Sequence, residues 1–147
     1  MKRWTLLALL AAAGCNQANG DNLIGTHTLK SGRASNQCAH QPAQDVVLDA
    51  GEETLTIARI KDEHDALSLV DTNWGSCRFV ADATGPSDAT VVATTPTCVD
   101  PAGSGSSDSI ALVGGTLRHL GGHLAVSFQI TTVTDGALCS SDATLTF

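Results

Sequence analysis

Apolar and polar positions alternate along most of the chain after residue 22, and clusters of Gly, Asp, Asn, Ser and Pro interrupt the alternation. A period of two is typical of β-strands with one buried face. We expect strands in residues 23–33, 45–48, 54–60, 66–70, 75–84, 89–95, 109–120, 123–134 and 143–147. After residue 22, no stretch has a convincing helical period. The pattern therefore predicts an all-β fold, either an antiparallel sandwich or a small up-and-down barrel of about eight strands.

The clearest hairpin lies in residues 109–134, where Gly121 and Gly122 separate two long alternating stretches. Two glycines fit the positive φ angles of a primed two-residue turn. With that turn, residues Leu124, Val126, Phe128 and Ile130 on the second strand oppose His119, Leu117, Gly115 and Val113 on the first. We expect this face to belong to the core.

A second hairpin is expected around residues 85–88, whose sequence is Gly-Pro-Ser-Asp. Cys77 and Cys98 lie equally far from the midpoint between Ser87 and Asp88, so a hairpin centred there places them opposite each other. Directly opposed cross-strand residues are within reach of a disulfide. We therefore pair Cys77 with Cys98, which leaves Cys38 with Cys139 by default. The other two connectivities remain open.

The first fifteen residues differ from everything that follows. Lys2 and Arg3 precede an apolar run over residues 4–13, and the small residues Ala12, Ala13 and Gly14 precede Cys15. A charged head, a short apolar run and a small-residue cleavage site are typical of a signal peptide. The run is shorter than the roughly 20 residues that cross a bilayer as a helix. We expect residues 1–14 to form a signal helix that is removed on export.

This arrangement resembles the signal of bacterial lipoproteins, with Ala12 at the position where that family usually has Leu. The resemblance implies that Cys15 becomes the N-terminus and carries two or three acyl chains, palmitate among them, and two chains suffice for stable anchoring. Asn16, in place of Asp, implies sorting to the outer membrane. The alternative is ordinary cleavage nearby, which leaves Cys15 as a free thiol or removes it. We expect a flexible tether over residues 15–22 and one disulfide-braced β domain over residues 23–147.

The net charge and the number of cysteines limit which partners the protein can bind and which cellular compartment it can occupy. The leader holds two of the eight basic residues and none of the fifteen acidic ones, so the mature chain has a net charge of −9. Such an acidic surface argues against nucleic acid as a partner. Beyond Cys15 four cysteines remain, and an even number in an exported domain favours two disulfides.

The sequence contains only weak evidence for a catalytic or metal-binding site. His119 and His123 flank the Gly-Gly turn, so in the predicted register their side chains point to opposite faces of the hairpin and do not share a metal. His64 lies in an acidic turn that lacks the alternating pattern of a calcium loop. Residues 103–107 are rich in Gly and Ser but lack the Gly-Lys-Ser/Thr ending of a phosphate loop. We therefore predict no catalytic residue, no cofactor and no metal, and expect a protein that is not an enzyme.

The part after the leader weakly resembles the small lipocalin-like or β-sandwich domains of bacterial lipoproteins. Where lipocalins begin with Gly-x-Trp, this chain has Gly25, Thr26 and His27. Our leading interpretation is a membrane-anchored binding or structural module, in the periplasm or on the cell surface, with a protein partner. The alternative is a carrier of a small apolar ligand, and an enzyme or metal-binding protein ranks below both.

Overall fold

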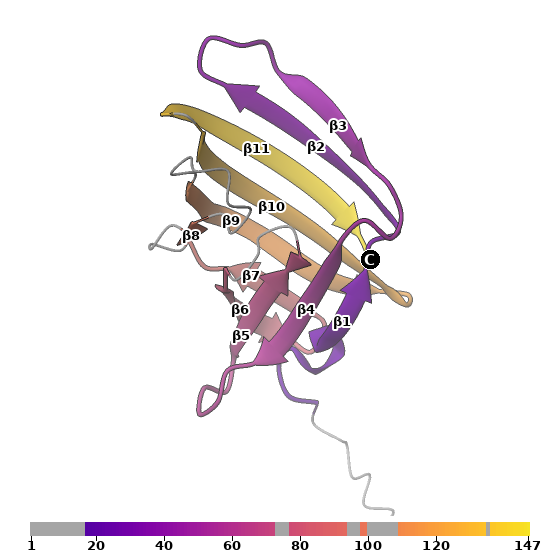
Figure 1. Ribbon diagram of the computed structural model, residues 1–147. Helices are drawn as coiled ribbons and strands as arrows, with labels where there is room; N and C mark the ends of the chain where they lie inside the picture. The colour runs from indigo at the N-terminus through magenta and orange to yellow at the C-terminus, as the bar shows by residue number, and fades with distance from the viewer. Residues whose placement is uncertain (1–16, 73–76, 94–97, 100–108, 135) are drawn as a thin grey trace, which may run out of the picture.

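One curled antiparallel sheet makes up nearly all of the computed structural model, and it forms a half-barrel (Figure 1). The structure describes residues 17–72, 77–93, 98–99, 109–134 and 136–147. Its strands are β1 (Gly25–Thr28), β2 (Ser31–Cys38), β3 (Gln44–Leu48), β4 (Thr54–Arg59), β5 (Ala66–Asp71), β6 (Phe79–Gly85), β7 (Asp88–Val91), β8 (Cys98–Val99), β9 (Ser109–Leu120), β10 (His123–Thr134) and β11 (Ala137–Thr146). The prediction of an all-β fold is confirmed. The predicted signal helix lies outside the described residues.

The strand order decides between the two predicted architectures. Ten strands follow one path, β1-β4-β5-β6-β7-β9-β10-β11-β2-β3, and β8 pairs with β9 beside it. The described strands thus form one sheet rather than the two layers of a sandwich, and they number more than the predicted eight. The difference has two causes. The stretch expected as one strand over residues 23–33 divides into β1 and β2, which join opposite ends of the sheet, and β8 was not among the expected strands.

The division between β1 and β2 occurs at two adjacent residues. The backbone N–H of Leu29 donates to the carbonyl of Glu53, 2.9 Å away, beside β4. The N–H of the next residue, Lys30, donates to the carbonyl of Thr146 on β11, at 2.8 Å. The chain itself therefore crosses at this point from the β1 and β4 end of the sheet to β11, near its other end.

The concave side of the lower part of the half-barrel is filled by side chains. Phe79 on β6 and Phe128 on β10 are 0% and 1% exposed, and they lie in one core cluster with buried leucines from β4, β5, β9, β10 and β11. Burial of each such side chain stabilises a fold by about 1.5–3 kcal/mol. The two phenylalanines occupy the space that an enclosed ligand cavity would need at this level of the fold.

The N-terminal segment is packed against this core. We predicted residues 15–22 to be a flexible tether, but from Asn19 onward the chain is hydrogen-bonded to the domain. Gly20 N–H donates to the carbonyl of Gly85 at 2.7 Å, and the Arg59 guanidinium donates to the carbonyl of Asn19 and to the carboxylate of Asp21. The side chain of Leu23 is fully buried. The domain thus begins several residues earlier than the predicted boundary at residue 23.

The hairpin of β9 and β10 confirms the predicted turn and three of the four predicted residue pairs. Gly121 and Gly122 both have positive φ, and Leu124, Val126 and Phe128 pair with His119, Leu117 and Gly115. Beyond Gln129 a bulge shifts the pairing, so that Ile130 lies opposite Leu112 and not opposite Val113. The expected place of Val113 in the core is therefore wrong: Val113 is 49% exposed and Leu112 is buried.

The register predicted for the hairpin around residues 85–88 is also wrong. Gly85 pairs with Asp88 and Ala81 with Val91, so the turn is centred earlier than we expected and a shift of register follows it. Cys98 belongs to β8, where it pairs with Ile110 of β9. The backbone pairing that led us to join Cys77 to Cys98 is therefore not present.

Candidate functional site

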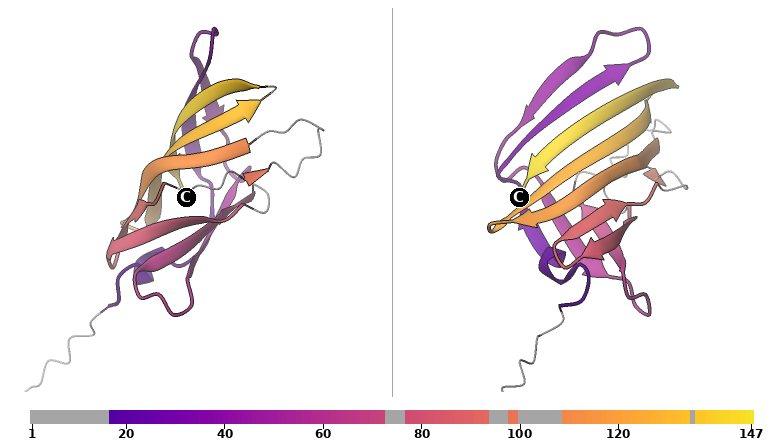
Figure 2. Two further views of the ribbon diagram at one scale, coloured as in Figure 1. Left: turned by 90° about the vertical axis from the view of Figure 1, so that its left-hand side faces the viewer. Right: turned by 180° about the vertical axis from the view of Figure 1, so that it is seen from behind.

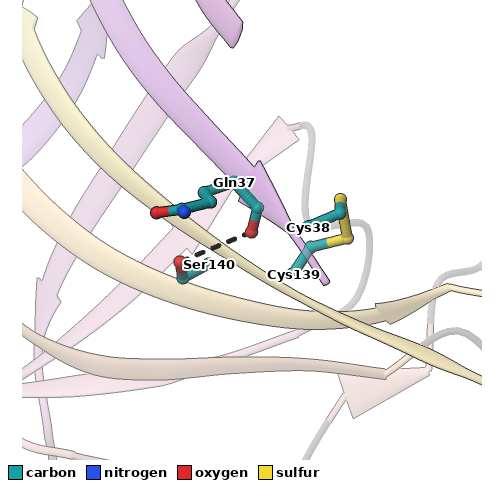
Figure 3. Close-up of a disulfide and its surroundings, with 4 residues drawn as sticks. All are labelled: Gln37, Cys38, Cys139 and Ser140. Atoms are coloured by element: carbon teal, nitrogen blue, oxygen red, sulfur yellow. Dashed lines mark hydrogen bonds between the residues drawn. A yellow bond between two sulfur atoms is a disulfide. The ribbon is translucent and has the colours of Figure 1, made fainter. Parts of the chain in front are cut away.

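The disulfide between Cys38 and Cys139 is formed, which confirms the pairing that we reached by default. The two residues lie opposite each other in the register of β2 and β11, with their Cα atoms 4.0 Å apart (Figure 3). Beside them, the Ser140 hydroxyl donates a hydrogen bond of 3.5 Å to the carbonyl of Gln37. The disulfide fixes the last residue of β2 to the first part of β11, far along the chain from it.

Cys77 and Cys98 are in a different position. Cys77 is a free thiol, 4% exposed, and packs in the hydrophobic core. The side chain of Cys98 lies outside the described part of the chain. Because Cys77 is a free thiol, the disulfide that we predicted between these two residues is not formed in the structure.

A groove lies on the concave face of the sheet beside the disulfide. Its volume is about 400 Å³, and the residues that line it are Asn36, Cys38, Ile110, Ile130, Thr132, Cys139, Ser140 and Ser141. They come from β2, β9, β10 and β11, at the end where these strands extend past the filled core. Ile110 and Ile130 are partly buried and pack against the edge of that core.

The lining of this groove is free of charge, although the chain carries a formal net charge of −7. Two isoleucines and the disulfide supply apolar surface, while Thr132, Ser141 and Asn36 supply a few hydrogen-bonding groups. Sites for small molecules typically combine apolar walls with a small number of polar groups, in volumes of about 300–1,000 Å³. The groove therefore suits an uncharged, largely apolar ligand.

The outward face of the sheet has a different chemistry. A hollow of about 430 Å³ there is lined by hydroxyl groups such as those of Thr90, Thr116 and Ser127, together with the ion pair between Arg118 and Asp88. Both charged side chains are well exposed, and exposed ion pairs contribute about 1 kcal/mol or less. This face has the composition of an ordinary solvated sheet.

The histidines lie apart from one another. His119 pairs with Leu124 and His123 with Leu120, as we predicted for a hairpin that separates the two imidazoles. His123 Nδ1 lies 2.9 Å from Lys30 Nζ, and His27 Nε2 lies 2.9 Å from the carbonyl oxygen of Leu23. His64 is exposed in its turn. Within the described ranges, no three His, Cys, Asp or Glu side chains come together in a way that could hold a metal ion.

Two carboxylates are buried, and neither was singled out from the sequence. Asp71 is 0% exposed and pairs with Leu55, and Glu53 is 5% exposed. Glu53 lies in phase with Leu55 and Ile57, and Asp71 lies in phase with Leu67 and Leu69. Residues two positions apart on a strand face the same side of the sheet, so this spacing indicates from the sequence alone that both carboxylates face the core.

Cys15 and the leader, which carry the predicted lipid anchor, lie outside the described residues. In the described part of the chain, no helix has the length and apolar character needed to cross a membrane. No protein-family model, curated protein or solved structure matches this chain.

Proposed function

We propose that this protein is an exported lipoprotein, anchored to the outer membrane through Cys15, whose half-barrel is a binding module. The anchor rests on the leader and on its resemblance to lipoprotein signals. The disulfide of Cys38 and Cys139 supports export, since disulfides persist mainly in oxidising compartments. Because the chain is packed on the domain from Asn19 onward, an acylated Cys15 would hold the half-barrel close to the membrane.

We further propose that the concave groove binds the apolar part of a small uncharged ligand. The observation that carries this proposal is the uncharged, partly buried lining of the groove in an otherwise acidic protein. A strongly acidic domain would repel anions, and an uncharged groove offers no counter-charge to a cation. The proposal contains no catalytic residue, no cofactor and no nucleic acid partner.

The anchor is tested by the intact mass of the protein purified from a membrane fraction. We expect the loss of residues 1–14 and the added mass of a diacylglyceryl group and an acyl chain on Cys15. Cys15→Ser is expected to yield protein without this added mass and to release it from the membrane fraction. An unmodified N-terminus at any other residue would contradict the anchor and would leave the groove untouched.

The groove is tested with N-phenyl-1-naphthylamine, an uncharged apolar fluorophore. We expect the fluorescence of this probe to rise when the protein is added. Charged aromatic acids should not displace the probe. Ile130→Ser places a hydroxyl in the apolar wall and should weaken probe binding by about tenfold, because roughly 1.4 kcal/mol of apolar contact is lost. Leu138→Ser is the matched control, since Leu138 is 61% exposed and does not line the groove. Equal binding by both variants would place the probe elsewhere.

A further inference from the structure

In the described part of the chain the sheet ends at β3, and no further strand pairs with this edge, which we call the open edge. Among the described residues, β3 pairs with β2 alone, and it is the last strand of the ten-strand path. The hairpin of β2 and β3 lies at the end of the molecule opposite the packed N-terminal segment (Figures 1 and 2). A strand at such an edge presents a row of backbone N–H and C=O groups that can pair with another chain.

Natural sheets usually guard their edges, and β3 has few of the usual guards. Its five residues, Gln44–Leu48, contain no Lys, Arg or Pro, and its pairing with β2 has no bulge. Val46 and Val47 are 38% and 69% exposed, so β-branched apolar side chains lie at the open edge. The opposite edge, β1, has only four residues and begins with a glycine. The two edges of the sheet are therefore not equivalent.

The charges around β3 indicate what kind of strand fits beside it. Asp45 lies within the strand and Asp49 follows its end, so two carboxylates flank the residues Val46, Val47 and Leu48. Opposite charges on directly opposed strand positions stabilise pairing, while like charges oppose it. A complementary strand therefore carries basic residues at both ends of a short apolar run.

We propose that β3 binds an extended segment of a partner protein, by strand addition, and that this segment has an apolar β-branched run flanked by Lys or Arg. Backbone pairing with the open edge would supply the affinity, and the two aspartates would select the charge. A second copy of this chain is less suited, because it brings a net charge of −9 and the same two aspartates to the contact. The proposed surface is separate from the groove and from the lipid anchor, so its test is independent of theirs.

The experiment uses the full chain with the capped peptide Lys-Val-Thr-Val-Lys as the probe. We expect titration to shift the backbone amide NMR signals of Gln44–Leu48 and to slow their hydrogen exchange, with no change at Gly25–Thr28 of the other edge. The peptide Glu-Val-Thr-Val-Glu is the charge-reversed control and should bind at least tenfold more weakly. A third peptide, N-methylated at every backbone nitrogen, cannot donate to a strand and should not bind.

Val47→Lys adds a positive charge to the open edge and should weaken binding of the basic peptide at least fivefold. Leu138→Lys adds the same charge at an exposed position on β11 and should leave binding unchanged. Binding of the N-methylated peptide would overturn strand addition, and so would NMR shifts that spread evenly over the protein. Neither of these results depends on the folding of a variant. Dimerisation in sedimentation experiments that Val47→Lys abolishes would also overturn the proposal, since a second copy would then occupy the edge.

Discussion

Removal of the disulfide, by Cys38→Ser together with Cys139→Ser, is expected to lower the free energy of unfolding by about 3–5 kcal/mol. The bond joins residues 101 positions apart, so its loss restores much conformational freedom to the unfolded chain. A typical domain is stable by only about 5–15 kcal/mol, so this loss is a large fraction of the total. Urea unfolding of the double variant, followed by circular dichroism, gives the value.

The control for this variant is Leu138→Ser, which changes an exposed residue next to Cys139 and removes no covalent bond. We expect its free energy of unfolding to lie within about 0.5 kcal/mol of the wild type. In the double variant, amide exchange should accelerate first in the hairpin of β2 and β3, because these strands extend past the core. A loss below about 1 kcal/mol would mean that strand pairing alone holds β2 against β11.

Gly115→Ala is expected to lower the free energy of unfolding by more than about 2 kcal/mol. A Cβ atom at this position would lie 2.2 Å from the carbonyl oxygen of Ser127 on the paired strand and 3.1 Å from the ring of Phe128. The oxygen belongs to the backbone, so β9 and β10 would have to move apart where Phe128 enters the core. Gly115 also has φ of 157°, a value that favours glycine.

Gly114→Ala is the matched control, one residue earlier on the same strand. Here a Cβ atom would meet only the flexible end of the Gln129 side chain, at 3.6 Å. We expect a change of less than about 1 kcal/mol, because nothing rigid has to move. Thermal unfolding of both variants measures the difference, and equal melting temperatures would show that close backbone approach at Gly115 is not required.

Alternation along the chain was enough to predict the fold class and the longest hairpin. Two glycines between two alternating stretches fixed the turn at residues 121–122, and the pairing of Leu124, Val126 and Phe128 followed from it. Both facts depend on neighbours in the sequence, because a two-residue turn sets the register of the strands on either side. The groove beside the disulfide was not visible in this way, since its residues come from four strands.

What the sequence by itself determined about this protein is therefore local: β-strands, the Gly-Gly turn, an acidic net charge and an even number of cysteines after residue 15. The tertiary structure alone decided the bulge that buries Leu112 in place of Val113, the crossing at Leu29 and Lys30, and the open edge of β3. Each of these depends on which strand lies beside which. Such pairing is set by the packing of side chains from distant segments around Phe79 and Phe128. It therefore cannot be predicted from any short stretch of the sequence.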